Sequence, residues 1–347
     1  MASPEIELKS EPKQTTSWWK LLLAVLLGLG LLWLAFKDCN FEELKSYLNN
    51  LNLFWIIVCF VVGVISHLVR AVRWIWLLKP IADRKVSLWN SFYAVIVGYA
   101  VNVAIPRGGE VARLVAISKM EKLPWAAVLP TMFIDRILDL FALVVLIGIS
   151  LTLLPKEYLN SMPWLIPGGV VMLIASTIAL VLLPKADAII SWFANKEWVK
   201  KILPATLIEK LIELSSQFDK GTKSLVDPIG YPVIGFFTAF MWFLYGLNFY
   251  LMLLAFNIAD KVGFKNTLIS LTIGSAGNLI PTPGSSGSFH LLVKGALVET
   301  SHLNENLALA YATILHLVTF VIVPCIPAAI CLAINGYLSS KDSKQNS

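Results

Sequence analysis

Charged residues are scarce in this chain. Only 14% of its 347 residues are Asp, Glu, Lys or Arg, whereas 57% are hydrophobic. A soluble globular domain usually carries about 25% charged residues. The composition therefore excludes an ordinary soluble domain and indicates a polytopic membrane protein.

Cysteine is also rare, and the residue patterns of several enzyme classes are missing. The four cysteines are not spaced as metal ligands and three of them fall within apolar runs, so the sequence predicts no disulfide framework, no zinc site and no cofactor. It contains no GxxxxGK[ST] phosphate loop and no nucleophile elbow. These absences argue against an ATP-driven pump and against most hydrolases.

Little in the chain points to nucleic acid or to secretion. The formal net charge is +6, but the basic residues lie between apolar runs and form no basic arm, so membrane topology explains them better than nucleic-acid binding. The first apolar run, Trp18–Phe36, is not followed by a small-residue cleavage site. We predict a retained span there, preceded by a polar N-terminal tail over residues 1–17.

Long apolar runs, by contrast, are abundant. A transmembrane helix needs about 20 predominantly apolar residues. This criterion predicts six spans, which lie near residues 19–36, 53–78, 130–154, 164–183, 230–257 and 306–336.

Two further apolar segments are interrupted by proline and glycine. Residues 88–105 break at Pro106-Arg107-Gly108-Gly109 and resume over 109–128, and residues 267–282 break similarly before 285–300. Lipid cannot satisfy the backbone donors and acceptors of such a break, so protein must cover it or it must line a cavity. Each pair is predicted to be a re-entrant helical hairpin, although two full spans would give the same topology.

The two interruptions resemble each other. Four residues recur at one constant offset: Gly98, Ala100, Asn102 and Gly108 are matched by Gly274, Ala276, Asn278 and Gly284. The bias of Lys and Arg among the short loops places both termini in the cytoplasm, and it inserts the two hairpins from opposite faces. Interrupted segments in matching halves indicate a transport site near the bilayer midplane.

The sequence thus predicts an all-α polytopic membrane protein with about six spanning helices and two oppositely oriented re-entrant helical hairpins in an inverted repeat. One transmembrane domain would cover residues 18–336, with repeats near 53–154 and 230–336. Residues 184–229 read as an amphipathic cytoplasmic linker. Residues 337–347 are predicted to be a polar C-terminal tail.

A few ionisable residues interrupt the apolar background. Such groups cost about 2.5–3.5 kcal/mol each within a span on insertion scales, so they are candidate functional residues. The predicted cluster contains three basic and three acidic side chains: Arg107, Glu110, Arg113, Asp135, Arg136 and Asp139. Because these charges balance, the cluster suits a zwitterionic head group as well as an anionic one.

Two interpretations of this cluster remain open. It could be an ion-pair network that fastens the first hairpin to the 130–154 helix. Alternatively, some members face a polar cavity and contact a charged substrate, in which case the planar arginine fork matches phosphate oxygens.

The two breaks are candidate anion sites. A helix that restarts after a break presents free N–H groups and the positive end of its dipole, although the glycines could simply permit a tight turn. His290 adds a titratable group after the second break, whereas His316 is expected to be a hydrogen-bonded core residue. The predicted binding residues at the breaks are Asn102, Gly108, Gly109, Asn278, Gly284, Ser285, Gly287 and His290.

Arg70, Arg73 and Trp74 close the second span. Arginine and tryptophan near the end of a span usually anchor it at the membrane interface, and this is the role we predict for them. The alternative is a first contact for lipid phosphates.

At these positions the sequence resembles the lysylphosphatidylglycerol synthase transmembrane-region family, also called flippase-like domain proteins. The motifs that carry the resemblance are RAVRW at 70–74, N-x-x-x-P-R-G-G-E-x-x-R at 102–113, DR-x-x-D at 135–139 and PTPG-x-x-G at 281–287. The resemblance implies translocation of a lipid or lipid-linked product between leaflets. By it, the polar residues of the path are Glu110, Arg113, Asp135, Arg136 and Asp139. The chain departs from the family pattern at His290, where an acidic residue is expected.

We therefore expect a flippase-like lipid transporter of the cytoplasmic (inner) membrane and not an enzyme. The resemblance is to a freestanding member without the synthase domain. Its expected partners are membrane lipids and a separate lipid-modifying enzyme. Three alternatives remain: a membrane-embedded transferase or phosphatase with Asp135 or Glu110 as base, an ion-coupled carrier of a small anion, and an assembly partner for a lipid-modifying enzyme.

Overall fold

The described part of the chain is built from helices and contains no strand. The computed structural model describes residues 18–154, 165–182, 185–202, 204, 207–209, 212, 215–216 and 229–345. The predicted N-terminal tail, the predicted loop at 155–163 and much of the predicted 184–229 linker lie outside these residues. The all-α prediction is confirmed for the part that the structure describes.

The first half of the chain contains the two helices of the first predicted hairpin, α4 and α5, between longer helices. Its elements are α1 (Trp18–Phe36), α2 (Phe41–Asn49), α3 (Leu53–Leu78), η1 (Lys79–Ile81), α4 (Leu88–Ala104), α5 (Gly108–Glu121), α6 (Trp125–Leu153), α8 (Leu165–Leu182), α9 (Ala186–Ala194) and α10 (Glu197–Ile202).

The second half contains the helices of the second predicted hairpin, α13 and α14. Its elements are α12 (Gly230–Ala255), α13 (Ala259–Ala276), η4 (Gly277–Leu279), η5 (Pro283–Ser285), α14 (Ser288–Ser301), α15 (Glu305–His316), the π-helical segment η6 (Leu317–Ile322) and α16 (Val323–Gln345). α16 continues as a helix through most of the predicted C-terminal tail.

Four of the six predicted spans correspond to helices that are long and apolar enough to cross a membrane. These helices cover Leu53–Ile81, Trp125–Leu153, Gly230–Ala255 and Glu305–Tyr337. The predicted 19–36 span forms α1, which meets this criterion only together with α2, across a bend of 87°. The predicted 164–183 span forms the apolar helix α8.

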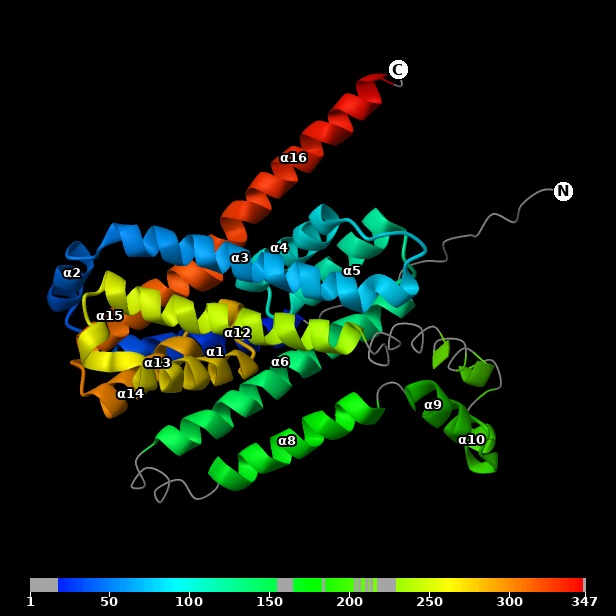
Figure 1. Cartoon of the computed structure of the whole chain (residues 1–347), viewed down its shortest axis with the longest axis horizontal. Coiled ribbons are helices and arrows are strands. Elements are labelled where there is room, and N and C mark those ends of the chain that lie inside the picture. Colours follow the sequence, from blue (N-terminus) through cyan, green and yellow to red (C-terminus); the bar gives the residue numbers. More distant parts are fainter. Residues whose placement is uncertain are drawn as a thin grey trace.

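Each predicted hairpin is present as a pair of helices that folds back on itself. α4 and α5 pack together toward one end of the long axis of the molecule, and α13 and α14 pack together toward the other (Figure 1). The second turn packs against the end of α4: a Cβ atom added to Gly284 in that turn would lie 3.5 Å from the Cα atom of Val103 in α4.

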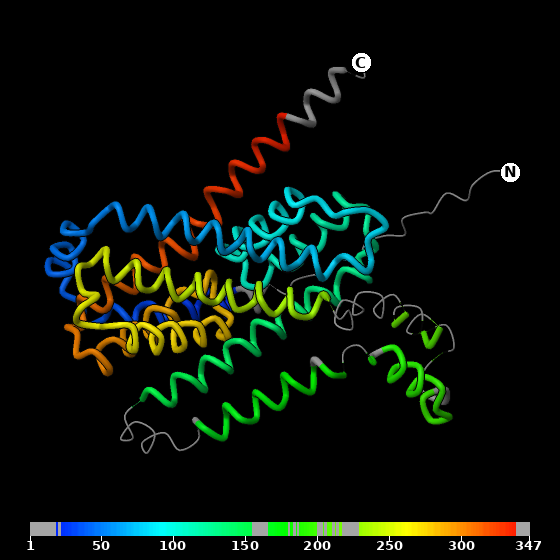
Figure 2. Tube along the Cα trace, in the orientation of Figure 1, coloured from blue at the N-terminus to red at the C-terminus, as the bar shows by residue number. Residues whose placement is uncertain are grey.

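The order of elements is the same in the two halves. A long helix, a folded-back pair and another long helix follow one another as α3, α4–α5 and α6, and again as α12, α13–α14 and the continuous helix formed by α15, η6 and α16. The first helices of the two sets, α3 and α12, pack against each other and run in opposite directions (Figure 2).

The two turns differ in length, which limits the repeat seen in the sequence. Only residues 105–107 separate α4 from α5, whereas residues 277–287 separate α13 from α14. Gly108 therefore begins α5, while Gly284 lies inside the second turn with a φ of 54°. The constant offset pairs Gly98 and Ala100 of α4 with Gly274 and Ala276 of α13, whereas Asn278 already lies in η4, where the longer turn has begun.

Two glycines allow α4 and α5 to approach closely. A Cβ atom on Gly109 would overlap the carbonyl oxygen of Gly98 on the facing helix. The backbone N–H of Gly109 donates to Oδ1 of Asn102 at 2.8 Å, which fixes the start of α5. At the open end of the pair, Glu121 accepts a hydrogen bond from the N–H of Ser87 at 3.0 Å. The first hairpin is thus held at both ends.

Gly109→Ala is expected to destabilise the protein by about 1–3 kcal/mol, the usual cost of overpacking, because the added methyl group forces α4 and α5 apart. Thermal unfolding of the purified protein in detergent would measure this change. The matched control is Gly295→Ala in α14, where the added methyl group meets open space. A helical Gly→Ala change there should leave stability equal or slightly higher. Equal unfolding temperatures for the two variants would contradict the close contact.

Candidate functional site

Buried charges gather where α3, α5 and α6 meet. Arg70 and Arg73 stand three residues apart on α3, and Asp135 and Asp139 stand four residues apart on α6. Residues at these spacings share one face of a helix, so two basic groups on α3 meet two acidic groups on α6. Arg113 on α5 completes the arginine–aspartate cluster, the name used below for these five residues.

Asp135 is the centre of the cluster. Its carboxylate is 0% exposed. It pairs with Nη1 of Arg70 at 2.9 Å, Nη2 of Arg73 at 2.6 Å and Nη1 of Arg113 at 2.8 Å. Ionised carboxylates are rarely buried without partners, and here three charge-assisted hydrogen bonds replace water.

Asp139 lies at the edge of the cluster, with 16% of its side chain exposed. It pairs with Nη2 of Arg70 and with Nη2 of Arg73, both at 2.8 Å. The guanidinium of Arg136 is further away, with Nη1 3.9 Å from Oδ2 of Asp139. Asp139 therefore links the buried cluster to the more exposed charges around it.

α12 supplies neutral partners to the cluster. Arg70 donates to the hydroxyl oxygen of Tyr245 at 3.1 Å, and Nη1 of Arg73 donates to Oγ1 of Thr238 at 3.0 Å. Sequence reasoning missed both residues, because an isolated Tyr or Thr within a 26-residue apolar helix gives little signal. With these bonds the cluster ties α12 to α3, α5 and α6.

Arg70, Arg73 and Trp74 are buried inside the protein, so the prediction that they anchor a span at the lipid interface is wrong. The indole N–H of Trp74 donates to Oγ1 of Thr131 at 3.0 Å. The ring of Trp74 lies under the guanidinium of Arg113, whose central carbon is 3.7 Å from the ring centroid. The physical reason is that the two aspartates of α6 require basic partners, which α3 provides. The RAVRW motif at 70–74 was the sequence feature that could have indicated a role inside the protein for these residues.

Glu110 and Arg136 form a second, more accessible ion pair. Oε1 of Glu110 is 2.8 Å from Nε of Arg136, and the two side chains are 40% and 37% exposed. Arg107 is exposed, adopts a left-handed conformation before α5 and belongs to no ion pair found among the described residues. The sequence places Arg107 in the predicted charged cluster, but in the structure Arg107 lies outside the cluster.

The charges of the site do not balance. With the Glu110–Arg136 pair included, four arginines face three carboxylates, which leaves one excess positive charge. The balanced count expected from the sequence is wrong, because Arg70 and Arg73 join the site and Arg107 does not.

The second turn has its own polar contacts. Nε2 of His316 lies 2.7 Å from the carbonyl oxygen of Gly284, and the ring centroids of His290 and His316 are 4.6 Å apart. Ser288 at the start of α14 donates to the carbonyl oxygen of Gly277 at 3.1 Å. His316 is thus a hydrogen-bonded core residue, as expected, and it holds the second turn in place.

The structure brings only part of the predicted site together. Glu110, Arg113, Asp135, Arg136 and Asp139 belong to one set of ion pairs, which Arg70 and Arg73 connect by pairing with both aspartates. The other predicted residues lie at the turns or apart from the cluster: Asn102, Gly108 and Gly109 flank the first turn, Gly284, Ser285 and Gly287 lie in the second turn, Asn278 is exposed, and His290 contacts His316. Among the described residues no hydrogen bond or ion pair joins His290 to the arginine–aspartate cluster.

The described residues contain no group of three or more His, Cys, Asp or Glu residues placed to hold a metal ion. The charged groups that the site contains are guanidinium and carboxylate groups. Such groups can bind an oxyanion, exchange ion-pair partners or screen a charge from the surrounding hydrocarbon.

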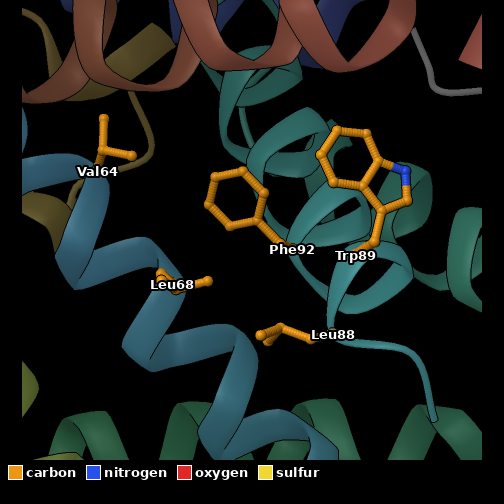
Figure 3. Close-up of a pocket in the computed structure, with 5 residues that line it drawn as sticks. All are labelled: Val64, Leu68, Leu88, Trp89 and Phe92. Carbon is orange, nitrogen blue, oxygen red and sulfur yellow. The ribbon is translucent and has the colours of Figure 1, made fainter. Parts of the chain in front are cut away.

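An apolar groove lies between α3 and α4 and has a volume of about 400 Å³. Its lining is entirely apolar apart from the indole nitrogen of a tryptophan: Val64, Leu68, Leu88, Trp89 and Phe92 (Figure 3). That nitrogen, Nε1 of Trp89, donates to Oδ1 of Asn335 on α16 at 3.2 Å. The groove suits hydrocarbon and not a charged head group.

Comparison with known proteins gives one extensive match and one partial match. Residues 21–326 match a family described as the lysylphosphatidylglycerol synthase TM region. A UPF0104 membrane protein of Methanocaldococcus jannaschii is 26% identical over 121 residues, which cover 34% of this chain and 33% of that protein. The match thus spans about a third of the length of this relative. No solved structure matches the chain.

Asp135→Asn should destabilise the protein by about 3–5 kcal/mol, because it leaves Arg113 without its carboxylate partner and leaves Arg70 and Arg73 to share Asp139. The control is Glu305→Gln, which breaks an ion pair with Lys294 whose acidic partner is 62% exposed, and which should cost less than about 1 kcal/mol. Thermal unfolding in detergent would compare the two. If Asp135→Asn lowers the unfolding temperature no more than Glu305→Gln does, Asp135 does not hold the helices together.

Proposed function

Because this chain belongs to the lysylphosphatidylglycerol synthase transmembrane-region family, we propose that it moves the head group of a membrane lipid between the two leaflets. The observation that carries the proposal is that the turn of one folded-back helix pair packs against the other pair, in a protein that also buries an arginine–aspartate cluster. Broken helices whose ends meet near the midplane are a common way for transporters to form binding sites.

In this proposal the two folded-back pairs are re-entrant hairpins inserted from opposite faces of the membrane. α4 and α5 contain 17 and 14 residues, so they are about 26 and 21 Å long, shorter than the roughly 30 Å hydrocarbon core. The repeated order of elements and the opposite directions of α3 and α12 support an inverted repeat. The Lys and Arg bias of the short loops supports cytoplasmic termini.

The head group is proposed to enter at the Glu110–Arg136 pair, whose members are both partly exposed. From there Asp139, which is near Arg136 and paired with Arg70, leads to the buried part of the cluster. A charged group that leaves water needs such partners, because an isolated charge in hydrocarbon is strongly disfavoured.

The acyl chains need no polar path, since they remain in hydrocarbon throughout. The apolar groove between α3 and α4 offers a surface that one acyl chain can contact while the head group moves. The polar and apolar ends of the lipid would thus use separate surfaces of the protein.

A membrane-embedded transferase or phosphatase fits the site less well. Both carboxylate oxygens of Asp135 accept hydrogen bonds from arginines, so this residue is poorly placed to act as a general base. Glu110 is also paired, with Arg136. The ion pairs favour binding and partner exchange over chemistry.

Glu110→Gln and Arg136→Gln are each expected to abolish leaflet exchange of a fluorescent phospholipid in reconstituted vesicles, because either change leaves a charge unpaired at the entrance. The assay would follow bleaching of the label by a membrane-impermeant reductant. Lys294→Gln removes one partner of the remote Lys294–Glu305 pair and should exchange lipid at the wild-type rate.

The same vesicles separate the alternatives. Uptake of a soluble anion without lipid movement would favour a small-anion carrier. Release or transfer of a group from the lipid would favour an enzyme. Either result, or undiminished exchange by both entrance variants, would refute the proposed path.

A further inference from the structure

The guanidinium of Arg113 uses only part of its hydrogen-bonding capacity. Its Nη1 donates to Asp135 at 2.8 Å, whereas Nε and Nη2 have no hydrogen-bond partner among the described residues. The side chain is 3% exposed. Buried donors are nearly always paired, and an unpaired one is destabilising. These two donors therefore require an explanation.

The two unpaired donors form a complete binding edge. In the planar guanidinium group, the Nε–H and Nη2–H bonds lie on the same side and point in nearly parallel directions. This fork matches two oxygens of one phosphate or carboxylate group. The stacked ring of Trp74 and the bond to Asp135 hold the plane of the guanidinium in position.

Arg113 differs in this respect from the other buried arginines. Arg70 donates from both terminal nitrogens, to Asp135 and to Tyr245, and only its Nε is unpaired. Arg73 likewise donates from both terminal nitrogens and leaves only Nε unpaired. Within the arginine–aspartate cluster, Arg113 alone presents two adjacent free donors.

The net charge of the site favours an anion at this edge. With Arg113 itself included, the four arginines of the site exceed its three carboxylates by one positive charge. A monoanionic group would neutralise the excess charge, whereas a zwitterionic head group, whose own cation balances its phosphate, would leave the excess in place.

We propose that the Nε/Nη2 edge of Arg113 binds the phosphodiester oxyanion of an anionic lipid. This inference rests on the proposed function and adds the class of substrate to it. Glu110 stands one helical turn before Arg113 on α5, so the accessible Glu110–Arg136 pair lies on the same side of α5 as Arg113. Because Arg113 is buried, the lipid reaches it only when the packing of α5 against α3 and α6 loosens.

The first test compares ligands on the unaltered, full-length protein in detergent. Its thermal unfolding would be followed during titration with phosphatidylglycerol, with phosphatidylcholine of the same acyl chains, with diacylglycerol and with inorganic phosphate. Phosphatidylglycerol should raise the unfolding temperature in a saturable manner, because ligands that bind the folded state stabilise it. Equal stabilisation by phosphatidylcholine or diacylglycerol would overturn the proposal. So would stabilisation by inorganic phosphate alone, which would assign the edge to a soluble anion.

The second test replaces the guanidinium of Arg113 with an ammonium group, which keeps the positive charge. Arg113→Lys should weaken the phosphatidylglycerol effect at least about tenfold, because a lysine ammonium cannot reproduce the bidentate contact. The matched control is Arg84→Lys, at an exposed arginine paired with Glu121, which should titrate like the wild type. An unchanged titration for Arg113→Lys would overturn the proposal. If this variant fails to fold, the ligand series on the unaltered protein still decides.

These measurements distinguish the inference from the proposed function. Arg113-dependent binding of phosphatidylglycerol without leaflet exchange would refute transport but retain the anion site. Leaflet exchange with no preference for the anionic lipid in the titrations would refute the anion site but retain transport.

Discussion

The structure depends on the burial of one carboxylate, that of Asp135. A carboxylate in a protein interior is strongly disfavoured unless it is paired and hydrogen-bonded, and Asp135 has three arginine partners on two other helices. Satisfying this single group fixes the positions of α3, α5 and α6 relative to one another. The shared partner Asp139 and the neutral partners on α12 extend the same network. The arginine–aspartate cluster therefore fixes the position of the first hairpin against α3 and α6 and also supplies the charged groups beside it.

A second constraint comes from the backbone. Where α4 ends and α5 begins, peptide groups lose their helical partners, and in an apolar environment the protein itself must replace them. Asn102 does so at the first turn, and His316 and Ser288 do so at the second. The contact between Gly284 and Val103 then packs the second turn against the end of α4. Polar side chains near the turns are thus needed for the fold before any role in transport is considered.

The site separates two kinds of surface that a lipid requires. Guanidinium and carboxylate groups lie where α5 meets α3 and α6, and the apolar groove lies between α3 and α4. In the proposed function, the excess positive charge and the two unpaired donors of Arg113 would favour an anionic head group over a zwitterionic one. Specificity would then come from the number and geometry of the arginines and not from a shape-matched cavity.

The sequence by itself determined the helices, because apolar runs and their breaks depend on local composition: α3 begins at Leu53 and ends at Leu78, as predicted. It also marked Arg113, Asp135 and Asp139, since a charge within an apolar run needs a partner wherever it lies. Only the tertiary structure decided which residues pair with these charged side chains. Arg70 and Arg73 beside a tryptophan have the local pattern of an interface anchor, and their burial follows from the packing of α3 against α6, which involves residues more than 60 positions away. The net charge, the free edge of Arg113 and the unequal turns likewise depend on contacts between distant segments, which no local pattern encodes.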